Sequence, residues 1–191
     1  GALKKIFVED IYRADEKLKE NIIPPIPLQH ITPNWGMRDA NWFADFPASA
    51  RKVMEFYKKD GGPDVDGVLT VTPDVISGIF DVIGPIEMPE YGVTLNPEKF
   101  VELIQYKVEA DYDKGLNQPK KILADFAPKF INGLAQLSPD NQKKALEIIF
   151  NSLKEKHILM YFSDDDLEEF VKKQGWAGEI LETEKDYLMS Q

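Results

Sequence analysis

The residues best suited to chemistry stand close together in the segment Arg38–Asp45. It reads Arg-Asp-Ala-Asn-Trp-Phe-Ala-Asp and has no helical or strand periodicity. The planar guanidinium of Arg38 could hold a phosphate or a carboxylate through two parallel hydrogen bonds. Asp39 or Asp45 could act as a general base or hold a divalent cation through oxygen. The segment therefore predicts a binding site of Arg38, Asp39, Asn41, Trp42 and Asp45, in which Arg38 and Asp39 are the catalytic candidates.

The same residue types also have structural uses. Asp39 and Asn41 are good turn formers, Asp45 can cap the helix that follows, and Arg38 can pair with a carboxylate. No second half of a catalytic motif accompanies them, so we favour a structural latch over a binding site. The latch would be anchored by Trp42 or Phe43 inserted into the core.

Other polar groupings have simpler explanations. Asp164–Asp166 looks like a cation-binding run, but it lacks the glycine and distal glutamate of a calcium loop and suits the start of a helix. Ser49 and Ser77 lie in no nucleophile-elbow pattern, and Gly61-Gly62-Pro63 lacks the lysine of a phosphate loop. We therefore expect no metal and no cofactor.

Composition excludes several classes of protein. The chain has 191 residues, with 33 acidic against 23 basic side chains and a net charge of −10. It shows no basic stripe of the kind that a nucleic-acid binder needs. The absence of cysteine excludes disulfides, thiolate metal sites and a cysteine nucleophile, and two histidines cannot form a histidine-rich metal site. No apolar run is long enough to span a bilayer.

The elements that must position these residues are organised around Val65–Met88. Val65–Val71 is rich in β-branched residues and apolar on both faces, which predicts an interior strand. Thr72 is the expected cap of a helix that begins at Pro73 and packs through Ile76, Ile79 and Phe80. Gly84-Pro85 ends the helix, and Ile86–Met88 is expected to pair with Tyr91–Leu95 as a short hairpin.

Helices and strands are expected on both sides of this unit. A helix is predicted at Asp10–Ile22, followed by an extended proline-rich segment at Ile23–Pro33 and a helix at Pro47–Lys59. We interpret the proline-rich segment as a rigid crossover rather than as a ligand for a proline-binding module. The remaining expectations are a helix capped by Asn96, a polar connector at Asp111–Gln118, a helix at Pro119–Leu137 kinked or split by Pro128, an antiparallel helix from Ser138, a strand at His157–Phe162, a helix capped by Ser163, and strands at Glu179–Glu182 and Asp186–Met189.

This order of elements predicts a single α/β domain over residues 1–191. We expect a mixed sheet covered by helices in a three-layer α/β/α sandwich. Gly1-Ala2 reads as a remnant of cloning, so we interpret the chain as a domain excised from a longer protein.

Several short motifs together resemble one bacterial family, the uncharacterised group called domain of unknown function 4012. They are Val8-Glu9-Asp10-Ile11-Tyr12, Arg38-Asp39-Ala40-Asn41-Trp42, Asp45-Phe46-Pro47-Ala48-Ser49-Ala50, Val65-Asp66-Gly67-Val68, Gly84-Pro85 and Gly175-Trp176-Ala177-Gly178. The resemblance implies an extracytoplasmic domain that is membrane-anchored through a helix upstream of this segment. It implies no reaction. We therefore expect a non-catalytic binding or assembly role at the bacterial cell envelope, with an envelope component as a candidate partner.

A fainter resemblance is to the LytR–CpsA–Psr phosphotransferases, which attach glycopolymers to the cell wall. Val65-Asp66-Gly67-Val68, the following helix and Gly84-Pro85 are similar to their strand–helix–glycine turn, and Arg38-Asp39 is similar to their Arg-Asp pair. That pair would bind a lipid pyrophosphate. The spacing between the pair and the strand is shorter here, and the other arginines of that family have no counterpart. This is the enzymatic alternative.

Overall fold

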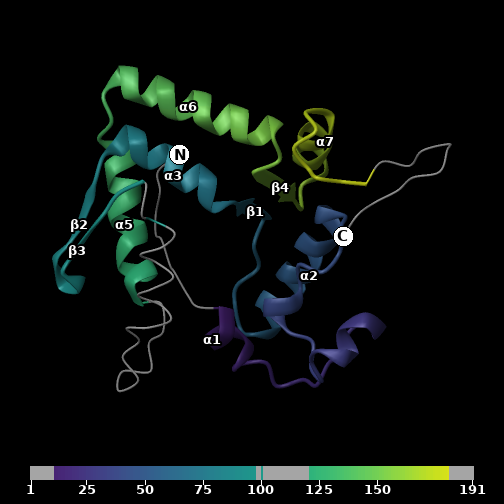
Figure 1. Ribbon diagram of the computed structural model, residues 1–191. Coiled ribbons are helices and arrows are strands. Elements are labelled where there is room, and N and C mark those ends of the chain that lie inside the picture. The colour runs from purple at the N-terminus through teal and green to yellow at the C-terminus, as the bar shows by residue number, and fades with distance from the viewer. Residues whose placement is uncertain (1–10, 98–99, 101–120, 181–191) are drawn as a thin grey trace. The chain divides into compact units, whose positions relative to one another are not determined.

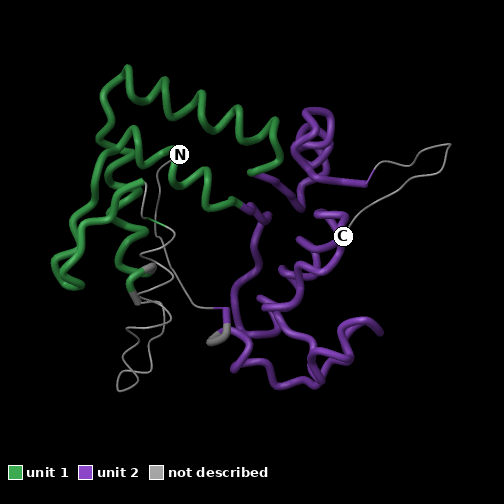
Figure 2. The backbone as a smooth tube through the Cα atoms, in the orientation of Figure 1, with its two compact units in different colours: residues 1–10, 71–157 green, residues 11–70, 158–191 purple. Residues whose placement is uncertain are grey.

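The structure is a computed structural model that describes residues 11–97, 100 and 121–180. The chain divides into two compact units (Figure 2). Unit 1 comprises residues 1–10 and 71–157, and unit 2 comprises residues 11–70 and 158–191. Each is described by itself below. The expectation of a single domain stays a prediction.

Unit 1 is built around the helix α3, Pro73–Ile83. Its bounds are those predicted, because Pro73 stands in the first turn and Gly84, at φ 88°, ends the helix. Val75, Ile79 and Phe80 form its buried face. Thr72 is the N-cap residue as expected, but its side chain does not cap the helix. Its Oγ1 lies instead 3.0 Å from Nδ1 of His157.

A short hairpin follows α3, as predicted. Strands β2 (Ile86–Met88) and β3 (Val93–Leu95) pair antiparallel, with Ile86 opposite Leu95, and the 3-10 turn η3 (Pro89–Tyr91) joins them. The turn is tied to α5 (Lys121–Ala135) through Tyr91 and Glu90. The Tyr91 hydroxyl donates to Asp125 at 2.7 Å, and Lys129 Nζ lies 2.9 Å from Oε1 of Glu90.

The helices α5 and α6 (Pro139–Lys154) both pack on α3. Figure 1 shows the axes of α5 and α6 crossing, not lying alongside one another, so the expected antiparallel pair is wrong. Gly133 makes the α5 contact close, because a Cβ atom there would lie 2.6 Å from Cγ2 of Ile83. Pro128 does not split α5, which is continuous from Lys121 to Ala135.

Phenylalanine rings fill the core of unit 1. Phe80 packs against Phe100, Phe126 and Phe130, with ring centroids 5.3–5.5 Å apart. Phe100 is buried as predicted. The rest of the helix expected after Asn96, the connector at 111–118 and the strand expected at 186–189 lie outside the described residues, as does most of the strand expected at 179–182.

Among the described residues, unit 2 includes α1 (Ile11–Asp15), which ends well before Ile22, the end of the helix predicted at Asp10–Ile22. At the end of this helix the Asp15 carboxylate is turned toward the backbone of residues 37–38. The proline-rich segment is not fully extended, since it contains the 3-10 helix η1 (Ile26–His30) with Leu28 buried. The helix α2 (Phe46–Lys59) lies within one residue of its expected position. The core here is formed by Leu28, Trp35, Ala40 and Phe56.

Strands β1 (Gly67–Val71) and β4 (Ile158–Phe162) form a small antiparallel sheet at the expected positions. The expected interior strand is wrong, because Leu69 is 56% exposed and β4 is the one neighbour of β1 among the described strands. The helix α7 (Asp165–Lys173) is capped by Asp164 rather than Ser163, since the Asp164 carboxylate accepts a hydrogen bond from Leu167 N at 3.0 Å.

The combination of helices with small antiparallel sheets agrees with the α/β class predicted from the sequence. The described residues contain two-stranded sheets, so the predicted three-layer sandwich is not seen in them. In the same residues no helix combines the length and hydrophobicity that crossing a membrane requires.

Candidate functional site

The centre of the candidate site is a carboxylate held against the start of a 3-10 helix. The helix η2 (Met37–Asp39) begins after Gly36, and the carboxylate of Asp15 accepts hydrogen bonds from the backbone N–H groups of Met37 and Arg38. A Cβ atom on residue 36 would lie 2.6 Å from Oδ1 of Asp15, so only glycine leaves room for this approach. Asp15 therefore satisfies the free donors at the N-terminus of η2.

The guanidinium of Arg38 closes over the same carboxylate. Its Nε lies 3.3 Å from Oδ2 of Asp39 and 3.6 Å from Oδ2 of Asp15, and its Nη2 donates to Oγ1 of Thr32 at 3.4 Å. The Arg38 side chain is 39% exposed, while that of Asp15 is 12% exposed. Arg38 thus has the close carboxylate partners that a structural latch requires.

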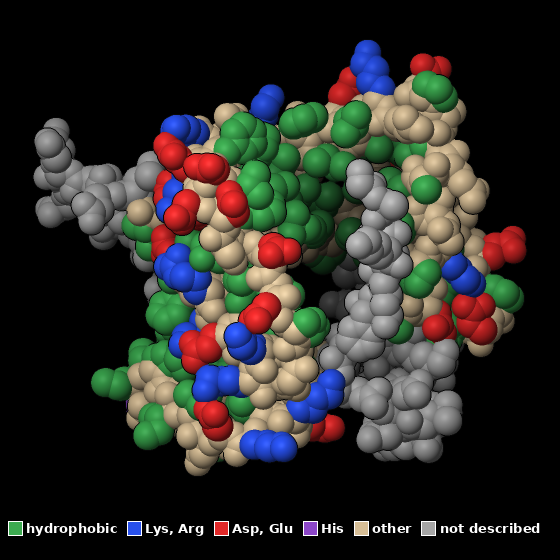
Figure 3. All heavy atoms as spheres, turned by 180° about the vertical axis from the view of Figure 1, so that it is seen from behind, with side chains coloured by type: hydrophobic (Ala, Val, Ile, Leu, Met, Phe, Trp, Pro, Cys, Tyr) green, Lys and Arg blue, Asp and Glu red, His purple; other side chains and the backbone are tan. Residues whose placement is uncertain are grey.

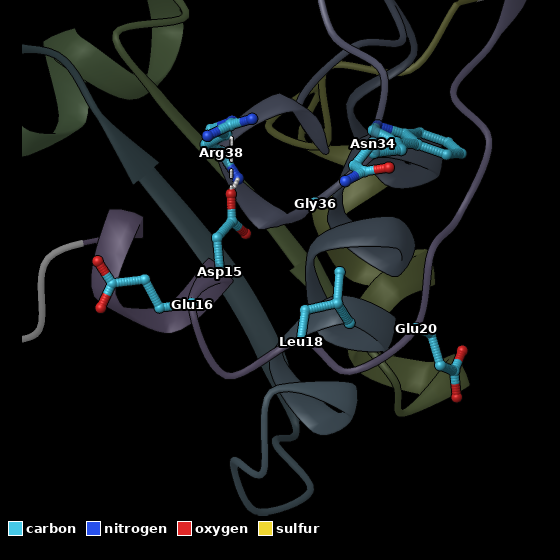
Figure 4. A pocket seen from close by; sticks show the side chains of 8 residues that line it. Asp15, Glu16, Leu18, Glu20, Asn34, Gly36 and Arg38 are labelled. Carbon is cyan, nitrogen blue, oxygen red and sulfur yellow. Dashed lines mark hydrogen bonds and ion pairs between the residues drawn. The ribbon is translucent and has the colours of Figure 1, made fainter.

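We call the contacts among Asp15, Thr32, Arg38 and Asp39 the latch. A pocket of about 290 Å³ opens beside it (Figure 4). Figure 4 shows Asp15 directed at Arg38, whereas the Glu16 and Glu20 side chains spread away from the pair. Carboxylates outnumber cations in the lining, which consists of Asp15, Glu16, Leu18, Glu20, Asn34, Trp35, Gly36 and Arg38. The charge of this lining disfavours anions such as phosphate or pyrophosphate.

Trp35 provides the rigid wall of the pocket. Its indole Nε1 donates to the Asp39 carbonyl at 3.0 Å, and its ring meets Phe56 edge-on with centroids 5.4 Å apart. Lys52 Nζ lies 5.0 Å from the ring centroid, within the range of a cation–π contact. Glu20 pairs with Lys59, and this hydrogen bond raises the pKa of Lys59.

Asp45, another of the predicted site residues, has a structural role. Asp45 is the N-cap of α2, as its alternative role predicted, with Ala48 N donating to its Oδ2 at 3.0 Å. Its Oδ1 accepts a second hydrogen bond from Ile180 N, also at 3.0 Å. Both carboxylate oxygens are thus used in the fold, which leaves Asp45 poorly placed to act as a base.

The expected anchor of the loop is wrong. Trp42 and Phe43 are both exposed over more than a third of their surface, and Asn41 is exposed as well. Trp35 is the buried aromatic residue instead, and Phe43 reaches only its edge, at 6.3 Å between ring centroids. Ser49 fixes the backbone at Phe43 by accepting from its N–H at 3.0 Å and donating to its carbonyl at 2.9 Å.

The structure therefore joins Arg38 and Asp39 to residues that the sequence analysis did not select. Asp15 and Thr32 lie 23 and 6 residues from Arg38 in sequence. Asp15 lay within the helix predicted at Asp10–Ile22, and no local pattern distinguished it. Among the described residues no group of three or more potential metal ligands is present, and Asp164–Asp166 serves as the start of α7.

Comparison with known proteins gives one match. The model of the family described as "Protein of unknown function (DUF4012)" matches residues 16–108 and confirms the resemblance over that segment. No curated protein and no solved structure matches the chain. The matched segment includes the latch residues Gly36, Arg38 and Asp39, while Asp15 immediately precedes it.

Proposed function

Because residues 16–108 match the model of this family of uncharacterised proteins, we propose that the chain is a non-catalytic domain with a binding or assembly role at the bacterial cell envelope. It would act outside the cytoplasm and be carried there by the full-length protein. The location rests on the family resemblance of the sequence. The non-catalytic role rests on the geometry of the latch.

One observation carries the non-catalytic role. Arg38 is held by Asp15 and Asp39 at 3.6 and 3.3 Å, and the same Asp15 satisfies two backbone donors. A catalytic arginine or aspartate must be free to contact a substrate, whereas these side chains satisfy one another and fix the start of η2. This arrangement stabilises the fold and leaves no free base at the pair.

The phosphotransferase alternative needs a different electrostatic environment. A pyrophosphate pocket requires several cationic donors, and the lining here contributes Arg38 against Asp15, Glu16 and Glu20. On the face drawn in Figure 3, the Lys and Arg side chains of the described residues are interspersed with Asp and Glu and form no basic stripe. The charge pattern therefore favours the non-catalytic role.

Ligand-dependent melting tests that role. The thermal midpoint of the chain should not rise on addition of phosphate or pyrophosphate, because Asp15 already occupies the anion-binding donors. Two variants accompany the natural chain. Asp15→Asn removes the negative charge of the carboxylate, and Arg38→Ala removes the guanidinium. A rise in the midpoint of the natural chain that disappears in Arg38→Ala would refute the proposal and favour the phosphotransferase.

Accessibility to protease tests the location. The test uses bacteria whose outer layers have been removed but whose cytoplasmic membrane is intact. The domain within the full-length protein should be digested by an added protease while a cytoplasmic marker survives. Protection of the domain until the cells are lysed would place it inside the cytoplasm and contradict the envelope role.

A further inference from the structure

The helix α7 exposes apolar residues and buries a charged one. Leu167 is 50% and Phe170 is 52% exposed, whereas Glu168 and Val171 are buried. Glu168 has a structural use inside, since its Oε2 accepts a hydrogen bond from Phe162 N of β4 at 3.0 Å. Among the described residues, the buried face of α7 packs on β4, and the apolar pair Leu167 and Phe170 stays exposed as a contact surface.

Phe170 is held in place on this surface. Its ring meets the ring of Trp176 edge-on, with centroids 6.0 Å apart and an interplanar angle of 81°. An aromatic side chain fixed before contact loses little conformational freedom when a partner covers it. Phe170 therefore has the properties of an interface anchor.

The charges around Phe170 are arranged with opposite signs at the two ends of the helix. The first turn carries Asp165, Asp166 and Glu168, and the last turn carries Lys172 and Lys173. Asp166, Phe170 and Lys173 recur at helical spacing and so share one face. With a rise of about 1.5 Å per residue, Asp166 lies about 6 Å before Phe170 along the axis, and Lys173 lies about 4.5 Å after it.

We propose that this face of α7, defined by Asp166, Leu167, Phe170 and Lys173, binds the same face of a second copy of the chain. Two α7 helices would lie antiparallel about a two-fold axis near Phe170. Asp166 of each copy then faces Lys173 of the other, and the apolar side chains fill the centre. A surface that is complementary to itself fits a second copy better than an unrelated partner, because such an interface uses one patch twice.

Lys173 remains accessible for this contact. It pairs with Glu169 at 2.6 Å, but both side chains are well exposed, at 69% and 64%. Exposed pairs of this kind contribute little to stability and readily exchange partners. The helix has only 9 residues, so the interface is small, and association is weak and concentration-dependent. The surface uses none of the residues of the Arg38 site and does not depend on the proposed function.

Charge exchange tests the pairing directly. Sedimentation velocity between about 10 μM and about 1 mM should show a monomer–dimer equilibrium for the natural chain. Asp166→Lys and Lys173→Asp should each weaken association by about tenfold, because each places like charges opposite one another. An equimolar mixture of the two variants should associate more strongly than either alone, since opposite charges then meet at both ends. Phe170→Ala should abolish the dimer.

Two controls make the result decisive. Lys143→Asp, on the exposed surface of α6, makes the same charge change away from α7 and should leave association weakened by far less than Lys173→Asp. Circular dichroism should show that every variant remains folded. A chain that is monomeric at all concentrations overturns the proposal and assigns the face to a different partner. A dimer that is insensitive to the α7 substitutions also overturns it, because the contact must then use another surface.

Discussion

The carboxylate of Asp15 occupies the space that a side chain at Gly36 would need, because a Cβ atom there would lie 2.6 Å from its Oδ1. The backbone of Gly36, at φ −139°, is open to any residue, so the requirement is for space rather than for an unusual conformation. This relationship links α1 to η2 and places Arg38 over the same carboxylate. It is the contact on which the latch depends.

Gly36→Ala should destabilise the chain by about 1–3 kcal/mol, because the added methyl group displaces Asp15 from its backbone donors. The effect should depend on Asp15. In an Asp15→Ala background the methyl group meets no carboxylate. The losses in free energy of unfolding caused by Gly36→Ala and by Asp15→Ala should therefore not add. Denaturant unfolding of the natural chain, both single variants and the double variant measures this coupling. Strictly additive free energies would show that Asp15 does not occupy the space at Gly36.

Arg38→Ala should lower the free energy of unfolding by about 1 kcal/mol, since it removes charge-assisted contacts from a partly exposed side chain. Arg51→Ala is the matched control. Arg51 is also exposed, and its guanidinium lies 5.6 Å from the ring centroid of Tyr161 without a described carboxylate partner. Arg51→Ala should lower the free energy of unfolding by less than Arg38→Ala does. An Arg38→Ala variant as stable as the natural chain would exclude the latch.

Phe80→Ala should cost about 3–5 kcal/mol, because the side chain is fully buried among three other phenylalanine rings. Phe150→Ala provides a control within the same unit, as Phe150 is 51% exposed on α6. Its loss should cost under about 1 kcal/mol. Chemical denaturation compares the two, and a cost for Phe80→Ala below about 1 kcal/mol would show that these rings do not form the core of the unit.

The ion pair between Glu90 and Lys129 should be visible in a titration. The hydrogen bond from Lys129 lowers the pKa of Glu90 below its ordinary value. A carboxylate with a lowered folded-state pKa contributes stability above its unfolded-state pKa, and this contribution is lost as the pH falls through the folded-state pKa. Nuclear magnetic resonance of the side-chain carbonyl carbon should show the lowered pKa, and Lys129→Ala should return it toward the ordinary value. An unchanged pKa in that variant would mean that Lys129 is not the cause.

The sequence by itself determined the elements whose signals are local. Pro73 and Gly84-Pro85 set the bounds of α3, and the Asp45 cap set the start of α2, because helix starts and chain reversals depend on residues within one helical turn. The hairpin of β2 and β3 was predictable for the same reason. The segment that contains Arg38 and Asp39 could also be selected, since its residue types and its lack of periodicity are visible in the sequence.

Only the tertiary structure decided what those residues contact. Asp15 reaches Arg38 across 23 residues of sequence, Gly36 leaves room for that contact, and α1 ends at Asp15, far earlier than its apolar spacing predicted. The buried position of Glu168 and the exposure of Leu69 likewise follow from which neighbours are present. A helical or strand pattern states that one face is apolar, but burial and charge pairing depend on which distant segment comes to lie against that face.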